Sequence, residues 1–282
     1  MFDSSSAEPQ LIDLMHLGRA KVIGAWRIGD VIVDPGPSSC LGELLAALAR
    51  HPPRVLALTH IHLDHAGAAG SLVRRFPDAE VWVHERGAAH LSDPSKLLAS
   101  ARRLYGEDMD RLWGEVLPVP ADRLRVLRGG EVIGEFEVAY TPGHASHHVS
   151  YLHLPTRRAF TGDVTGVRIG EGRVMAPTPP PDIDVEAWQV SLDLVEAWRP
   201  AALSLTHFGN YDDVAGHLAA ARAALDYERE LALGSSEEGF CAAIRAAISS
   251  SGAADAAAAY EQAMPPAQSY SGLRRYLERR PS

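Results

Sequence analysis

Six consecutive residues, His60-Ile61-His62-Leu63-Asp64-His65, bring three imidazoles and one carboxylate into one short stretch. Zinc and related divalent cations take four or five ligands, and imidazole nitrogens and carboxylate oxygens are among those they prefer. In an extended loop alternate residues point to the same side, so His60 and His62 can bind one metal ion. Asp64 and His65 can then turn toward a second ion. The spacing therefore predicts metal-dependent chemistry rather than a polar loop.

Further potential ligands occur downstream, and each follows an apolar run. His144 ends the tight turn Thr141-Pro142-Gly143-His144, Asp163 follows Gly162, and His207 follows Thr206. Open α/β layers place their sites just beyond the carboxyl ends of strands. We therefore expect these side chains to lie at one edge of the fold, near the His-rich stretch.

The elements that must position these residues are predicted from apolar patterning. Short apolar runs punctuated by glycine predict strands over 11–17, 21–28, 30–34, 54–59, 80–83, 131–140, 149–154, 158–161 and 202–206. Helical spacing predicts helices over 41–50, between the His-rich loop and Phe76, and over 185–198 and 212–231. We expect a helical insertion at 85–118, within a main domain of residues 1–232, and a helical C-terminal extension over 233–282. Strands alternating with helices in two halves predict an α/β layered fold.

Length and composition exclude several classes of protein. The 282 residues are 46% hydrophobic and 22% charged, which is ordinary for a globular chain that needs no disulfides. The formal net charge of −9 argues against a dedicated nucleic-acid binder. No run approaches the roughly 20 apolar residues of a membrane span, and residues 1–10 lack a signal-peptide pattern. With two isolated cysteines, these features predict a cytoplasmic protein without a membrane or nucleic-acid partner.

The ordered set HxHxDH, TPGH, GD and a final His resembles the metallo-β-lactamase superfamily, over roughly residues 10–230. The resemblance implies an αββα sandwich with a two-metal site at one edge. In it, His60, His62 and His144 would bind the first ion, while Asp64, His65 and His207 would bind the second. Asp163 would bridge both ions. Asp34 resembles the family's buried aspartate, which orients ligating imidazoles; the alternative is a turn-forming Asp before Pro35-Gly36.

The resemblance also implies an activity: hydrolysis of a thioester, lactone or ester by a hydroxide that bridges two divalent cations, with Asp64 passing a proton to the leaving group. The glyoxalase II and lactonase branches are the nearest in pattern. Zinc is the expected metal, with iron or manganese as alternatives. A phosphodiesterase or nuclease of the same fold, and an iron-dependent dioxygenase of the persulfide-oxidising type, remain alternative activities.

Other residues carry weaker predictions. His148 falls at the second His of a TPGHxxxH pattern similar to that of glyoxalase II, and we expect it, Tyr105 and Met175 to contact a small-molecule substrate. The segment Ser271 to Arg275 is predicted as a solvated helix face, with binding of an anion or a partner subunit as the alternative. The insertion and the C-terminal extension are plausible surfaces for a homodimer.

Overall fold

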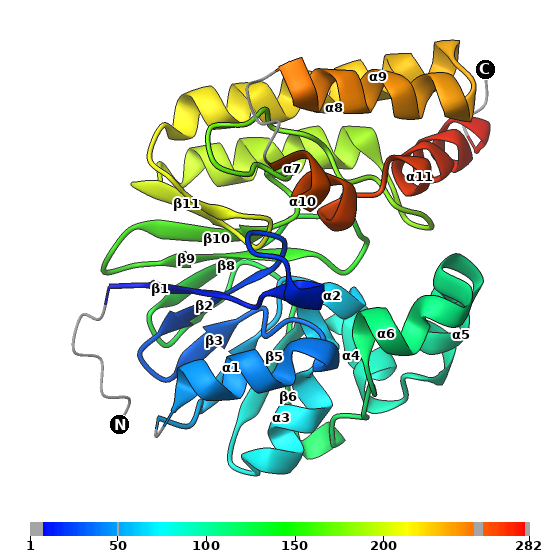
Figure 1. Cartoon of the computed structure of the whole chain (residues 1–282). Coiled ribbons are helices and arrows are strands. Elements are labelled where there is room, and N and C mark those ends of the chain that lie inside the picture. The colour runs from blue at the N-terminus through cyan, green and yellow to red at the C-terminus, as the bar shows by residue number, and fades with distance from the viewer. Residues whose placement is uncertain (1–7, 50, 251–255, 280–282) are drawn as a thin grey trace.

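The computed structural model describes residues 8–49, 51–250 and 256–279. The predicted helix end at Arg50 and the parts of the predicted domains at 1–7, 251–255 and 280–282 lie outside the described residues. Two six-stranded sheets face each other, and helices cover both outer faces (Figure 1). This is the predicted αββα arrangement.

The first sheet contains the strands that carry the N-terminal half of the site. Its spatial order is β1 (Gln10–Asp13), β2 (Gly24–Ile28), β3 (Val31–Val33), β4 (Val55–Ala57), β5 (Glu80–His84) and β6 (Leu124–Leu127). Strands β3 to β6 run parallel, while β1 and β2 pair antiparallel. The carboxyl ends of β3 and β4, which lead to Asp34 and His60, therefore meet at one edge.

The second sheet supplies the remaining ligands. Its spatial order is β12 (Gly209–Tyr211), β11 (Ala202–Leu205), β10 (Arg158–Gly162), β9 (Val149–His153), β8 (Phe136–Tyr140) and β7 (Val132–Ile133). Strands β10 and β11 are parallel, and β8 runs in the same direction because β9 is antiparallel to both β8 and β10. His144, Asp163 and His207 thus follow strand ends on the same side.

The helices of the described residues fall into four groups. The outer face of the first sheet is covered by helices that include α1 (Leu41–Leu48) and α3 (Ala69–Arg75), and that of the second by α7 (Val185–Ala197) and α8 (Val214–Gly234) (Figure 1). The insertion forms α4 (Glu85–Ser92), α5 (Ser95–Tyr105) and α6 (Met109–Trp113), and the C-terminal region forms α9 (Glu237–Ser250), α10 (Ala257–Ala263) and α11 (Pro266–Glu278). Short 3-10 turns occur at His16–Gly18, Ser38–Cys40, Gly106–Asp108 and Ala121–Arg123.

The central strands of both sheets are buried along their whole length, so each sheet has two covered apolar faces. Trp26 and Trp82 of the first sheet pack with Phe136, Tyr151 and Phe160 of the second, in the layer between the sheets. A larger cluster joins the outer faces of the sheets to the helices that cover them. Because strands with two covered faces need apolar residues throughout, this packing explains the continuous apolar run at Val55–Ala57.

The C-terminal helices share the main core. Phe240, Ile244, Tyr260 and Leu273 belong to the same buried cluster as the sandwich. Gly272 of α11 lies so close to the chain at Thr178 that an added Cβ would meet a carbonyl oxygen at 1.9 Å. Helix α8 continues through the boundary expected at 232/233.

Several predicted boundaries are corrected by the structure. The predicted 131–140 strand is split into β7 and β8 by a turn at Gly134, whose φ is +56°. Residues 11–17 contain β1 followed by a 3-10 turn rather than one strand. Strands β6 and β12 were not predicted. The His-rich stretch is only partly a loop, because α2 (Leu63–Ala66) begins within it.

Candidate metal centre

Seven side chains converge at the edge where the strands end. His60 and His62 precede α2, Asp64 and His65 lie in its first turn, and His144, Asp163 and His207 arrive from the second sheet. Three overlapping groups bring their ligand atoms within 4.8 Å of one another: His60 with His62 and His144, His60 with His65 and Asp163, and Asp64 with His65 and His207. The structure therefore brings together all seven residues that the sequence singled out.

Distances divide the cluster into two halves that share Asp163. Nδ1 of His62 lies 3.0 Å from Nε2 of both His60 and His144. Nε2 of His207 lies 3.3 Å from Oδ2 of Asp64. The Asp163 carboxylate extends to both halves, with Oδ2 3.3 Å from His144 Nε2 and Oδ1 3.3 Å from His65 Nε2. This is the position expected of a bridging carboxylate.

The outer nitrogens of the histidines show which lone pairs face the centre. Nδ1 of His144 donates to the Pro177 carbonyl at 2.8 Å, and Nδ1 of His207 donates to the Val22 carbonyl at 2.5 Å. Nδ1 of His65 donates to Asp34 at 2.8 Å. A proton on Nδ1 leaves Nε2 with a free lone pair, which is the form that binds a metal ion.

Asp34 links the two sheets beneath the site. Its carboxylate accepts hydrogen bonds from the Thr59 amide at 2.8 Å, the Thr59 hydroxyl at 2.7 Å, the Thr206 hydroxyl at 2.8 Å and His65. Since the Thr59 hydroxyl proton is directed to Asp34, its oxygen is free to accept from Nδ1 of His60, 3.1 Å away. The imidazole-orienting role predicted for Asp34 matches this geometry. Thr59 and Thr206 carried no comparable signal in the sequence.

The buried polar atoms at the centre fit divalent cations. Among the described residues, Nε2 of His65, Oδ1 of Asp163 and Nε2 of His207 have no hydrogen-bond partner despite being fully buried. Unpaired buried groups are costly, and a cation bound between them would satisfy all three. Five imidazoles and two carboxylates also form the donor set expected for a two-metal site of zinc, iron or manganese.

Comparisons with known proteins agree with this geometry. The family model described as the metallo-beta-lactamase superfamily matches residues 29–207. The chain belongs to the metallo-β-lactamase superfamily. Within it, a metallo-β-lactamase fold-containing protein of Sulfurisphaera tokodaii is 30% identical over 164 residues, 55% of this chain and 60% of that protein. The hydroxyacylglutathione hydrolase of Pectobacterium carotovorum subsp. carotovorum is 31% identical over 151 residues, 53% of this chain and 47% of that enzyme. The chain thus spans about half to three fifths of these relatives.

Solved structures of the superfamily share the fold. A structure described as an archaeal protein from Sulfolobus tokodaii superposes with a TM-score of 0.63 at 23% identity, covering 81% of this chain and 87% of that one. A Thermus thermophilus protein gives 0.62 at 18% identity, covering 96% and 92%. A third protein, solved in a di-iron-bound form, gives 0.51 at 26% identity, covering 64% and 83%.

Protonation differs between the two halves of this metallo-β-lactamase centre. Burial and the neighbouring His144 lower the pKa of His62 to about 4, and burial also lowers the pKa of His60 and His144. Burial acts in the same direction on His65 and His207, but it is outweighed by nearby carboxylates, Asp163 first, which raise the pKa of both rings. A cation in the second half must therefore displace protons, so its affinity falls as pH falls.

The centre forms the base of a cavity of about 1000 Å³. His62, Asp64, Asp163 and His207 line the base, and the insertion and the C-terminal helices supply walls. Tyr105 lines the cavity, as expected of a substrate-contacting residue, and its ring packs edge-on against Trp113 at a centroid distance of 5.0 Å.

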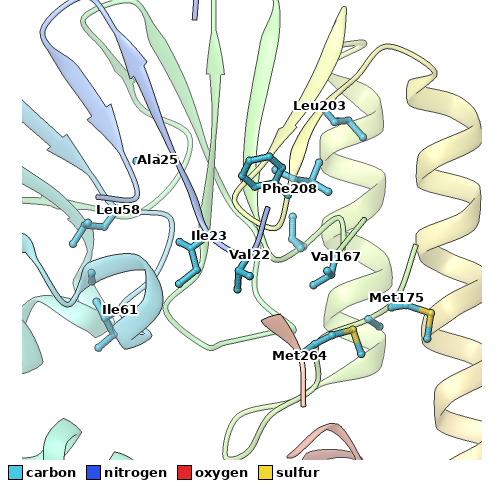
Figure 2. Packing of buried hydrophobic residues seen from close by; sticks show 14 of the residues in the cluster. Val22, Ile23, Ala25, Leu58, Ile61, Val167, Met175, Leu203, Phe208 and Met264 are labelled. Atoms are coloured by element: carbon cyan, nitrogen blue, oxygen red, sulfur yellow. The ribbon is translucent and has the colours of Figure 1, made fainter. Parts of the chain in front are cut away.

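The structure corrects the substrate-binding predictions for His148 and Met175, which do not line the cavity. Met175 is completely buried in the core, where Figure 2 shows it near its backbone bridge partner Val167. His148 is also completely buried, with Nδ1 2.9 Å from the Thr141 hydroxyl and Nε2 accepting from the Asp163 amide at 3.4 Å. Its ring therefore holds the backbone that carries Asp163.

Another cavity residue was missed entirely. His16 stacks on Trp113 with a ring distance of 5.6 Å, Nε2 donates to the Leu112 carbonyl at 2.9 Å, and Nδ1 accepts from Gln262 at 2.9 Å. The ring thereby ties the N-terminal segment to both α6 and α10. No motif surrounds His16 in the sequence, so only the three-dimensional arrangement identifies it.

Proposed function

We propose that this chain is a dinuclear metal-dependent hydrolase that cleaves a thioester, lactone or ester. The observation that carries the proposal is the complete set of seven ligands, divided in two halves around Asp163, at the base of a large cavity. Similarity to hydroxyacylglutathione hydrolases supports a carbonyl substrate. Two bound cations would supply an activated water molecule and polarise the carbonyl oxygen under attack.

The residues of the chain position and protonate the reactants. Asp64 is the more exposed carboxylate at the centre, with 21% of its side chain accessible against 5% for Asp163. Burial raises the pKa of Asp64, but His65 and His207 outweigh this effect and lower it below the usual range, so the carboxylate is ionised. Its oxygens can therefore accept a proton at the cavity and return it to the leaving group.

Replacing Asp64 with asparagine tests this role. The amide retains one oxygen for the second ion but cannot carry a proton, so we expect kcat to fall by roughly 10²-fold or more. Metal content should fall much less than the rate. Metal analysis and steady-state kinetics on the same preparation separate the two effects. A variant with full metal content and an unchanged kcat would remove Asp64 from proton transfer.

We propose zinc as the resident metal, with iron or manganese as alternatives. The donor set suits all three metals, and the relative solved in a di-iron-bound form supports iron as an alternative. We also propose a small-molecule substrate and a cytoplasmic location, without a nucleic-acid or membrane partner. No helix within the described ranges is long and apolar enough to span a bilayer.

The substrate class is tested by a ratio of kcat/KM values. Metal-loaded protein should hydrolyse a small thioester or lactone at least about tenfold more efficiently than an activated phosphodiester. The Asp163→Ala variant, prepared in parallel, serves as the blank for contaminating hydrolases. A large excess for the phosphodiester would instead assign the chain to phosphodiester hydrolysis and overturn the proposal.

A further inference from the structure

The two main walls of the cavity differ in chemistry. The insertion presents a mainly apolar surface that also carries three polar side chains: the apolar residues are Leu97, Ala101, Leu104, Tyr105, Leu112 and Trp113, and the polar ones are Ser100, Arg103 and Asp108. Opposite it, α11 presents mainly polar and charged side chains, namely Gln268, Ser269, Ser271, Arg274, Arg275 and Glu278. The chain before α11 adds Gln262 and the apolar Ala263, Met264 and Pro265. Figure 1 shows α5 and α6 on one side of the molecule's open edge and α10 and α11 on the other. A molecule that fills the cavity must therefore contact both kinds of surface.

Charges along the walls are not balanced by internal pairs. Asp108 is paired with Arg111 at 3.0 Å, and Glu278 with Arg274 at 3.6 Å. Arg103 and Arg275 also line the cavity, and neither has an ion pair or hydrogen bond within the described ranges. Among the described carboxylates that line the cavity, Glu237 has no ion pair. The walls therefore carry two unpaired cations and one unpaired anion. Guanidinium groups at a cavity wall are well suited to carboxylates and phosphates.

We infer that the substrate is an acyl thioester or ester that combines an apolar acyl group with an anionic leaving group. The acyl chain lies against the leucines of the insertion, and the scissile carbonyl lies over the base. Arg103 of α5 and Arg275 of α11 hold the anion from the two facing walls. Hydrolysis adds one water across the acyl C–S or C–O bond: a new C–O bond forms, the old bond breaks, and the thiol or alcohol leaves with a proton. This inference rests on the proposed function and narrows its substrate class.

The acyl preference is tested with the metal-loaded full chain. S-octanoyl and S-acetyl thioesters of one carrier are compared, and we expect kcat/KM to be at least about tenfold higher for octanoyl, because the added methylenes leave water. Leu104 lines the cavity without belonging to a buried cluster, so Leu104→Gln should reduce this ratio about threefold without unfolding the protein. Leu194→Gln, on the exposed surface of α7, is the control and should leave the ratio unchanged.

The anion preference is tested with three octanoyl thioesters: those of 4′-phosphopantetheine, glutathione and N-acetylcysteamine. The first carries a phosphate, the second carries carboxylates, and the third is neutral, so the faster of the first two identifies the anion. Arg103→Gln and Arg275→Gln should each raise KM for the preferred anionic substrate about five- to tenfold, with little change for the neutral one. Arg102→Gln changes a neighbouring arginine that does not line the cavity, and it should have no such effect.

The outcomes distinguish this inference from the proposed function. If the loaded protein hydrolyses no thioester, lactone or ester above its Asp163→Ala blank, the proposed function fails. If it hydrolyses short neutral thioesters as efficiently as long anionic ones, only the inference about substrate class fails. Equal losses in the Arg102 and Arg275 variants would likewise reject the assigned anion contact.

Discussion

Replacing Asp163 with alanine is expected to remove metal ions from both halves of the centre and to reduce kcat/KM by at least about 10³-fold. The carboxylate approaches His144 on one side and His65 on the other, at 3.3 Å each. Without it, five imidazoles remain with a single carboxylate, Asp64, to offset the charge of two cations. Each half would lose a ligand and the negative charge between the ions.

Metal content by elemental analysis and kcat/KM measured on the same sample check this expectation. Asp226→Ala is a suitable control, because Asp226 lies exposed on α8, away from the cavity. The control should keep wild-type metal content and rate. A variant at 163 that retained two metal equivalents and normal turnover would show that the ligand assignment is wrong.

Replacing Glu228 with glutamine should stabilise the protein at alkaline pH. Glu228 is completely buried in α8, where Oε1 accepts from the Ala176 amide at 2.8 Å and Oε2 has no hydrogen-bond partner among the described residues. Burial raises the pKa of this carboxyl from 4.5 to about 8, against the opposing effects of the Ala176 amide and Arg173. The folded protein therefore keeps a proton that the unfolded chain loses near pH 4.5.

The direction in which stability changes with pH follows from proton linkage. Between about pH 4.5 and 8 the folded state binds one more proton than the unfolded state at this site, so stability decreases as pH rises and then levels off. Glutamine remains neutral throughout. We expect equal free energies of unfolding near pH 4, and an advantage approaching about 5 kcal/mol for Glu228→Gln above pH 8.

Urea unfolding near pH 4 and above pH 8 measures the difference in the free energy of unfolding between the two proteins. The other titratable groups are the same in both proteins, so their contributions cancel. Glu230→Gln on the same helix is the control; Glu230 is 63% exposed, and its loss should change stability by less than about 1 kcal/mol. Identical pH profiles for wild type and Glu228→Gln would contradict the buried neutral carboxyl. Glu228 accepts a hydrogen bond from the amide of Ala176, and the next residue, Pro177, supplies the carbonyl that orients His144. Metal affinity therefore provides a second readout.

The ligands could be predicted from the sequence because they cluster in motifs and follow buried strands. Asp64 and His65 do come together with His207, although the sequence placed them in a loop rather than in α2. Strand β6 escaped prediction because it is a four-residue edge strand whose apolar pattern is interrupted by Arg125. Strand β12 escaped prediction because it is only three residues long and begins two residues after His207, too soon to show a pattern of its own.

Tyr105 was predicted, but most of the cavity wall could not be, since it depends on contacts between distant segments. Met175 was misassigned because position along the chain after Asp163 does not show which way a side chain points; the bridge to Val167 turns it into the core. His16, Arg103 and Arg275 lie up to about 260 residues apart and meet at one cavity only through the fold. The alternative of anion binding at Ser271 to Arg275 stays a prediction.

Helix α6 and most of α5 pack through a small hydrophobic cluster, in which Leu63 of the metal-binding stretch joins Met109 and Trp113, whereas α4 joins the main core through Leu91. On the proposed substrate class, the metal chemistry and the acyl selectivity are therefore held by different parts of the chain. The strand ends fix the ligands, whereas residues 95–113 can diverge without disturbing them, provided that an apolar partner for Leu63 is retained. If the substrate is of the proposed class, grafting a segment from another protein here should keep the reaction and change the acyl preference. The fold thus leaves substrate choice open to evolution while the metal ligands stay fixed.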